Sequence, residues 1–217
     1  MSNPLILQLH GHDIFEGFDP MPFPEDPEGW NSRHPVLKQV LEVKKPAIVV
    51  EVGVWKGAST LFMAEIMRAQ QIGGTVIAID TFLGSLEHVR DPQSWASMNS
   101  RHGWPNIYFQ FLANVVRADL QNHVCPLPQT ADIACQLLSS RGIRPGMVHI
   151  DGSHDHASVM RDLENYFALL EPGGVLVGDD FVLAWPEVVW AATEFAKRYG
   201  LALQHSAGKF VIEKPRN

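Results

Sequence analysis

Short apolar runs alternate with longer segments of helical periodicity along most of the chain. Five runs are rich in Val, Ile and Leu and predict buried strands at 47–52, 75–80, 124–127, 147–151 and 175–179. Apolar residues at helical spacing predict helices over 32–43, 59–69, 107–120, 131–140, 157–170 and 186–199. Strands that alternate with helices in this way indicate an α/β fold with a mostly parallel, doubly wound sheet.

The two ends of the chain depart from this alternation. Residues 201–205 and 210–213 are joined through a Gly-containing turn and predict a C-terminal antiparallel hairpin. Residues 4–31 are irregular, because four prolines between 20 and 27 exclude a long helix. We therefore predict an N-terminal arm over 1–34, which is either a lid over the active site or a surface extension. A single domain follows over 35–217.

Composition limits the possible partners. The net charge of −7 argues against non-specific binding to nucleic acid. No apolar run approaches the length of a membrane span, and the first residues have neither a basic start nor a long apolar core, so they do not form a signal peptide. The two cysteines provide no disulfide framework. We expect a cytoplasmic protein with no membrane or nucleic-acid partner.

Carboxylates follow the predicted strands at or near the points where they end. These acids are Glu51, Asp80, Asp151, Asp179 and Asp180. In an open α/β sheet, ligands bind in the crevice at the carboxyl ends of the strands, so we expect these side chains to face one crevice. Several unneutralised acids at one edge would repel one another. The crevice is therefore expected to hold something cationic or rich in hydroxyl groups.

A glycine motif lies between the first strand and the helix that follows it. It reads Glu51-x-Gly53-x-x-x-Gly57, in which Gly53 allows a tight turn and Gly57 allows close packing at the helix start. The spacing is not that of the dinucleotide motif G-x-G-x-x-G. Asp80, one strand further, is positioned to bind a ribose diol.

These features resemble those of class I S-adenosylmethionine-dependent methyltransferases. The segment 51–57 is similar to the first motif of that superfamily, Asp80 matches its acid after the second strand, and Glu171-Pro172-Gly173-Gly174 is similar to the turn before its fifth strand. The resemblance implies a Rossmann-like fold with a seven-stranded sheet, and S-adenosylmethionine as cofactor. It implies cofactor contacts from Glu51, Gly53, Trp55, Gly57, Ser59, Asp80, Thr81, Phe82, Gln129, Thr130 and Asp151.

A narrower resemblance concerns the acids after the fourth and fifth strands. Asp151, Asp179 and Asp180 resemble the metal-binding triad of the catechol, caffeoyl-CoA and macrolide-sugar O-methyltransferases. In the catechol enzyme the third ligand is Asn, whereas the macrolide group has Asp. The resemblance implies Mg²⁺ or another divalent cation, which would bind the acceptor oxygen and lower its pKa. The other interpretation of Asp179 and Asp180 is a pair of capping or turn residues.

His154 lies three residues after Asp151, where the catechol enzyme has a lysine that takes the hydroxyl proton. Imidazole suits the same task near neutral pH, so we predict His154 and Asp151 as the catalytic residues. His154 could equally donate to a substrate oxygen or cap a helix. Trp55 either forms a wall of the site or packs internally. The aromatic segment 81–105 forms either a substrate wall or a packed insertion.

The most specific hypothesis is a metal-assisted O-methyltransferase. It would methylate a hydroxyl of a small molecule, either a sugar or a secondary metabolite. Many relatives form dimers, so the resemblance allows a homodimer. Two alternatives remain open: a non-catalytic cofactor-binding or scaffold module of the same fold, and a nucleotide-sugar or dinucleotide enzyme on a similar sheet.

Overall fold

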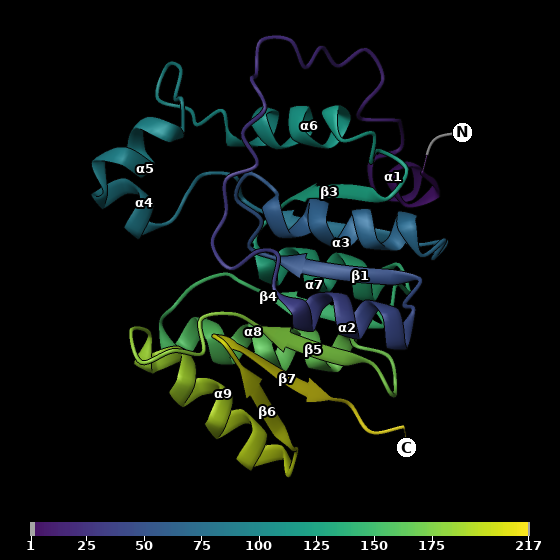
Figure 1. The fold of residues 1–217 in the computed structure, drawn as a ribbon, viewed down its shortest axis with the longest axis vertical. Coiled ribbons are helices and arrows are strands. Elements are labelled where there is room, and N and C mark those ends of the chain that lie inside the picture. The colour runs from purple at the N-terminus through teal and green to yellow at the C-terminus, as the bar shows by residue number, and fades with distance from the viewer. Residues whose placement is uncertain (1–2, 217) are drawn as a thin grey trace.

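A seven-stranded sheet lies at the centre of the computed structural model, which describes residues 3–216. Met1, Ser2 and Asn217, which the predicted arm and domain include, lie outside the described residues. The strands are β1 (Ile48–Val52), β2 (Thr75–Asp80), β3 (Val124–Pro128), β4 (Met147–Ile150), β5 (Val175–Gly178), β6 (Leu203–Ser206) and β7 (Lys209–Glu213). Their order is β3-β2-β1-β4-β5-β7-β6. β7 is antiparallel to both of its neighbours and β1–β5 are parallel, so the predicted doubly wound sheet with a C-terminal hairpin is confirmed (Figure 1).

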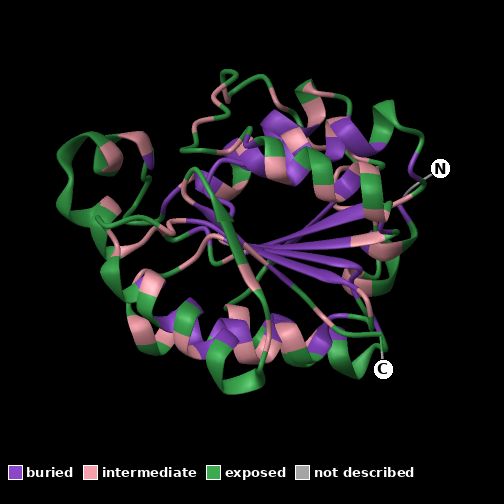
Figure 2. Cartoon of the chain, turned by 60° about the horizontal axis from the view of Figure 1, so that its bottom comes forward, coloured by how far each residue is buried: buried purple, intermediate pink, exposed green. Residues whose placement is uncertain are grey.

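Helices cover both faces of the sheet (Figure 2). One core contains residues of α2 (Pro35–Lys44), α3 (Ala58–Ala69) and α6 (Ile107–Arg117). The other contains residues of α1 (Pro4–His10), α7 (Ala131–Ser140), α8 (His156–Leu169) and α9 (Pro186–Tyr199). Because both faces are buried, the parallel strands are continuous apolar runs rather than alternating ones.

The strand order fixes where a ligand can bind. β2 and β3 lie on one side of β1, whereas β4 and β5 lie on the other. The chain therefore reverses direction across the sheet between β1 and β4. A crevice opens at such a switch point, at the carboxyl ends of the strands.

Three short helices occur where the sequence predicted none. α1 lies in the segment predicted to be irregular: the Asn3 side chain caps its start, Pro4 occupies its first turn, and Gly11 ends it before the proline cluster begins. α4 (Leu86–Arg90) and α5 (Pro92–Ser97) lie in the long segment after β2. They are too short to show a helical period, and the Ser85 and Asp91 side chains cap them. None of the helices within residues 3–216 has the length and apolarity needed to cross a bilayer.

Candidate functional site

A cavity of about 580 Å³ lies at the predicted edge of the sheet. Most of the predicted site residues line it, namely Gly53, Trp55, Ser59, Asp80, Thr81, Gln129, Asp151, His154, Asp179 and Asp180. They come from the segments that follow β1, β2, β3, β4 and β5, as the topology requires. Among the described residues that line the cavity, none is Lys or Arg.

Four residues expected to contact a cofactor do not line this cavity. Glu51 is fully buried beneath it. Gly57 packs against Phe111, which a Cβ on Gly57 would approach to 2.6 Å. Phe82 is buried against the same ring. Thr130 caps α7, where its side chain accepts from the N–H of Ile133. The contacts of these four residues within the protein are buried hydrogen bonds for Glu51, packing for Gly57 and Phe82, and capping for Thr130.

The turn after β1 is held tightly from both sides. A Cβ on Gly53, whose φ is +83°, would lie 1.8 Å from the Asp151 carbonyl oxygen, so only glycine fits there. Asp80 Oδ2 accepts from the N–H groups of Val54 and Trp55 at 2.8 and 2.9 Å, and its Oδ1 accepts from that of Phe82 at 2.7 Å. A carboxylate has about four acceptor positions, so Asp80 retains one for a ligand hydroxyl.

Glu51 connects three elements under the cavity. Its carboxylate accepts from the hydroxyls of Ser59 and Thr60 at the start of α3. His149 Nδ1 lies 3.0 Å from Glu51 Oε1, and the two residues are direct partners in the β1–β4 pairing. The acid that opens the glycine motif therefore holds β1, β4 and the start of α3 together beneath the cavity.

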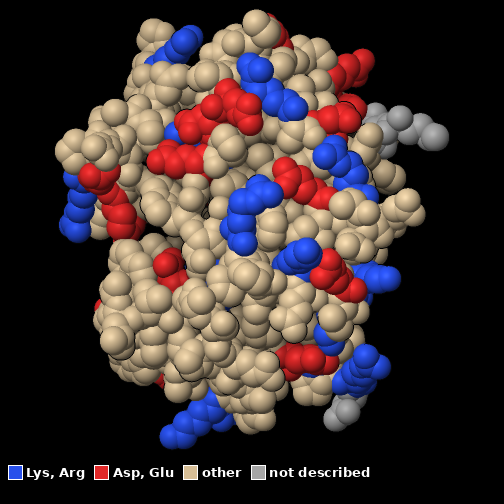
Figure 3. Space-filling model, in the orientation of Figure 1, with Lys and Arg blue, Asp and Glu red and all other residues tan. Residues whose placement is uncertain are grey.

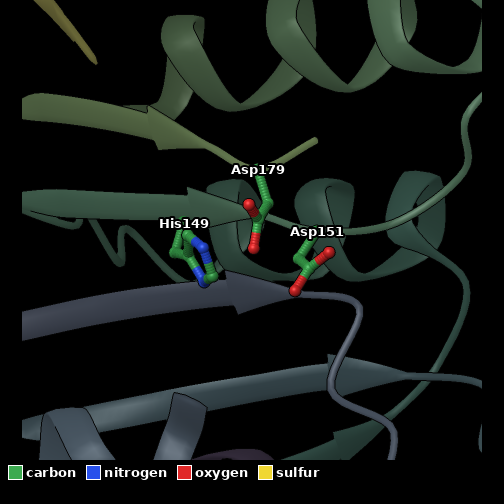
Figure 4. A group of neighbouring side chains, drawn as sticks. All are labelled: His149, Asp151 and Asp179. Carbon is green, nitrogen blue, oxygen red and sulfur yellow. The ribbon is translucent and has the colours of Figure 1, made fainter. Parts of the chain in front are cut away.

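A row of buried polar side chains continues from Glu51 through His149 to Asp179 and Lys209. Lys209 Nζ donates to Asp179 Oδ2 and lies 3.1 Å from His149 Nε2. Because an ammonium can only donate, His149 Nε2 accepts the hydrogen bond from Lys209. His149 Nδ1 therefore carries the ring proton and donates it in a hydrogen bond to Glu51. Figure 4 shows His149 and Asp179 beside Asp151 at the ends of two neighbouring strands.

The predicted metal triad is not assembled as the sequence suggested. The side chains whose ligand atoms lie within 4.8 Å of one another are His149, Asp151 and Asp179, and Asp180 is not among them. Asp180 adopts φ +57° and pairs with His154 instead. Asp179 Oδ1 accepts from Asn31 Nδ2 and the Asp180 N–H at 3.0 and 2.8 Å, and its Oδ2 accepts from Lys209. Because both oxygens of Asp179 already accept hydrogen bonds, these residues do not fit a divalent cation while Lys209 stays in place.

His154 also lines the cavity. Its Nε2 is 2.9 Å from Asp180 Oδ2, and its ring stacks on Trp185 with 4.0 Å between the ring centres. The hydrogen bond to Asp180 raises the pKa of His154, against the opposing effect of burial. Within residues 3–216, His154 Nδ1 is the buried side-chain nitrogen that has no hydrogen-bond partner. Asp180 therefore orients the ring, and the second nitrogen faces Glu87 Oε1 at 3.9 Å, beyond hydrogen-bonding distance.

Two cavity acids are shifted toward their neutral forms. Burial and the nearby negative charge of Asp179 raise the pKa of Asp151 well above its ordinary value, although Lys209 opposes the shift. Burial, and secondarily Asp132, raises the pKa of Asp162 in α8 to about 7. Asp162 lines the cavity, and the sequence analysis did not identify it because an acid inside a helix carries no strand-end signal.

The N-terminal arm contributes residues 28–32 to the cavity wall. Lys56, buried in the glycine turn, binds the arm through Asp26 at 2.6 Å and Glu28 at 2.8 Å. Asn31 reaches Asp179 at the far side of the site. The segment before α2 accordingly passes the carboxyl end of β1 in Figure 1.

Aromatic rings form the outer wall. Trp55 stacks on His88 with 3.9 Å between the ring centres and an interplanar angle of 9°. Trp30 of the arm lies 6.0 Å from His88 and is 59% exposed. All three residues line the cavity, so the segment after β2, which also contains α4 and α5, contributes His88 to its wall.

The sequence analysis missed His149 and Lys209, although a signal for both exists. Residues alternate between faces along a strand, so the period of two places Glu51, His149 and Asp179 on the same face. Lys209 follows a Gly turn and opens an apolar strand, where a charged side chain is unusual if both sheet faces are covered.

Comparison with known proteins agrees with the fold. A family described as a methyltransferase domain matches residues 50–181, which is more than half of the chain. No curated protein matches. Among solved structures, the O-methyltransferase NovP superposes with a TM-score of 0.64 at 21% identity, covering 85% of this chain and 80% of NovP.

Two further structures have the same fold. An O-methyltransferase from Bacillus cereus in complex with SAH has a TM-score of 0.60 at 15% identity, with 99% of this chain and 92% of that chain covered. The calicheamicin methyltransferase CalS11 has a TM-score of 0.59 at 16% identity, with 84% and 77% covered.

Proposed function

This chain belongs to the family of methyltransferase domains, and from that premise we propose that it transfers a methyl group from S-adenosylmethionine to a hydroxyl of a small molecule. The observation that carries the proposal is the cavity at the switch point, which is lined by the glycine turn, by acids and by an oriented histidine. The names of NovP, an O-methyltransferase, and of CalS11, a TDP-rhamnose 3′-O-methyltransferase, support an oxygen acceptor.

The cavity suits the cofactor in size and charge. S-adenosylmethionine, when bound, supplies an electrophilic methyl group on a positively charged sulfur. We propose that Asp80 accepts from a ribose hydroxyl with its remaining acceptor position, and that Gln129 and Asp162 lie against the adenine. We propose that the backbone N–H groups at the start of α3, including that of Ser59, bind the carboxylate of the cofactor, because the Gly57 cap leaves them without a side-chain partner.

His154 is the proposed general base. The acceptor hydroxyl must lose its proton as the new bond forms, and His154 Nδ1 is free to accept it. Asp180 holds the other nitrogen and stabilises the imidazolium that results. Alignment of the two reactants within the cavity supplies much of the remaining rate enhancement.

The charges of the cavity limit the acceptor class. Its wall carries acids and His but, among the described residues, no Lys or Arg. A phosphate or a CoA ester would therefore be repelled and would find no cationic partner. We propose an acceptor without phosphate, either neutral or amine-bearing, whose flat face packs on Trp30 or Trp185. A sugar or a secondary metabolite meets this description.

Metal assistance, which the resemblance implies, is a separate question. Carboxylates are suitable ligands for Mg²⁺, and Asp151 and Asp179 lie in one cluster with His149. A cation there would have to displace Lys209 from Asp179. The proposed reaction therefore needs S-adenosylmethionine and groups of the protein, but no metal ion.

Calorimetric titration of S-adenosylhomocysteine into the protein tests the proposal, with NAD as the control ligand. We expect S-adenosylhomocysteine to bind stoichiometrically and NAD not to bind. Acceptor panels should then contain matched pairs, such as a free sugar and its nucleotide-linked form, with only the free compound methylated. No binding of S-adenosylhomocysteine would overturn the function. Light scattering on the same sample tests whether the chain forms the homodimer that the resemblance allows.

A further inference from the structure

A buried lysine lies at the place where the resemblance implies a divalent cation. Lys209 is fully buried, and its ammonium contacts both Asp179 Oδ2 and His149 Nε2. These two residues belong to the one cluster of side chains within residues 3–216 that could hold a metal. Asp179 is also a predicted metal ligand, and the ammonium of Lys209 already binds its Oδ2 atom.

Strand register places this lysine. β5 and β7 are antiparallel with Gly178 opposite Phe210, so the next pair outward is Asp179 and Lys209. Phe210 and Ile212 pack in one core, which turns Lys209 to the opposite face of the sheet. Asp179 and His149 face the same side. The position of the ammonium thus follows from the sheet and not from a mobile loop.

The lysine completes the hydrogen bonds of His149 and occupies the second oxygen of Asp179. His149 accepts from Lys209 and donates to Glu51, whose carboxylate is satisfied by two hydroxyls. Asp179 Oδ1 is occupied by Asn31 and the Asp180 N–H. A divalent cation at this cluster would lie beside a buried ammonium at a few ångströms, where like charges repel strongly.

We infer that Lys209 is the resident cation of this site: its ammonium holds Asp179 and His149 in place of a divalent metal ion. The protein then binds no metal at this cluster and transfers methyl groups without one. Lys209 does not line the cavity, so it acts through Asp179 as a positioning residue. The metal-binding part of this inference stands by itself, whereas its consequence for catalysis rests on the proposed function.

Titration with Mn²⁺, followed by the loss of its free electron paramagnetic resonance signal, tests the inference without an acceptor. Wild type and Lys209→Arg, which keeps the positive charge, are expected to bind no Mn²⁺ stoichiometrically. Lys209→Met removes the charge and frees Asp179, so this variant should gain one bound Mn²⁺ per chain. The double variant Lys209→Met/Asp179→Asn should lose it again. If turnover is measured, a chelator should not affect wild type.

Two results would overturn the inference. One is stoichiometric Mn²⁺ binding by wild type that Asp179→Asn removes. The other is a Lys209→Met protein that keeps its circular dichroism spectrum and S-adenosylhomocysteine affinity but binds no Mn²⁺. If Lys209→Met does not fold, the titration of wild type still shows whether this cluster binds a metal ion. Failure of wild type to bind S-adenosylhomocysteine would contradict the proposed function and leave the Mn²⁺ result interpretable.

Discussion

His149 and Glu51 hydrogen-bond across the β1–β4 pairing, with 3.0 Å between Nδ1 and Oε1, and both side chains are fully buried. Glu51 also accepts from Ser59 and Thr60 of α3. The first acid of the glycine motif therefore joins two strands and a helix directly below the cavity. Its effect on a ligand is indirect, through the position of the turn that contains Gly53.

Glu51→Ala should destabilise the protein strongly. The change leaves two hydroxyls and an imidazole N–H buried without an acceptor, and we expect a loss of about 3–5 kcal/mol in the free energy of unfolding. Urea denaturation followed by circular dichroism measures it. Glu65→Ala is the matched control, because Glu65 pairs with Arg33 at the surface and should change stability by less than about 1 kcal/mol. Equal effects of the two substitutions would contradict the role assigned to Glu51.

His154→Gln should reduce kcat by about 10²–10⁴-fold, which is the usual contribution of a general base. Affinity for S-adenosylhomocysteine should stay unchanged, because His154 is assigned to the acceptor side. His156→Gln is the control: His156 bonds to Glu194 and packs on Trp190 away from the cavity. Similar losses of kcat in both variants would remove His154 from the mechanism.

The fold could be predicted from the sequence because its strands are buried on both faces. Val49 and Val50 pack into two different cores, so the run is apolar on both faces up to Glu51, near its end, and indicates a parallel strand. The short helices α4 and α5 could not be predicted, since five or six residues do not establish a helical period. Their caps at Ser85 and Asp91 are local signals that many turns also contain.

The site could be predicted as a location but not as a set of contacts. Strand ends identified Asp80, Asp151 and Asp179 as residues of one crevice. The pairing of Asp179 with Lys209 depends on the register between β5 and β7, which the sequence pattern does not fix. The direction of Asp180 depends on its left-handed backbone, at φ +57°, which turns the side chain toward His154. The metal triad was expected from the resemblance to metal-dependent O-methyltransferases, which contains neither fact.

Asp162 should make stability depend on pH. Its pKa is about 7 in the folded protein against 3.8 as an ordinary side chain. Between these values the folded state holds a proton that the unfolded state has released, so stability falls as the pH rises from about 4 to 7. Above pH 7 the loss is complete, at about 4 kcal/mol or less.

Asp162→Asn should remove that dependence, because the amide does not ionise. The variant is expected to be more stable than wild type at pH 8 and similar to it near pH 4, as measured by urea denaturation of the ligand-free protein. Asp119→Asn changes an exposed acid and should follow the wild-type profile. A difference between Asp162→Asn and wild type that is the same at both pH values would contradict the raised pKa.

Gly29→Ala should weaken cofactor binding by displacing the arm. A Cβ on Gly29 would lie 2.5 Å from the Cβ of Ala58, in the first turn of α3, so the arm must move away from the cavity that residues 28–32 line. We expect the Kd for S-adenosylhomocysteine to rise about tenfold, mainly through faster dissociation, since interface changes act mostly on that rate. Stopped-flow fluorescence of Trp30 and Trp55 follows the dissociation rate.

Gly73→Ala, where a Cβ meets nothing within 4 Å, is the control. An unchanged dissociation rate in Gly29→Ala would mean that the arm is a surface extension, because a lid that is pushed off its seat cannot retain the ligand.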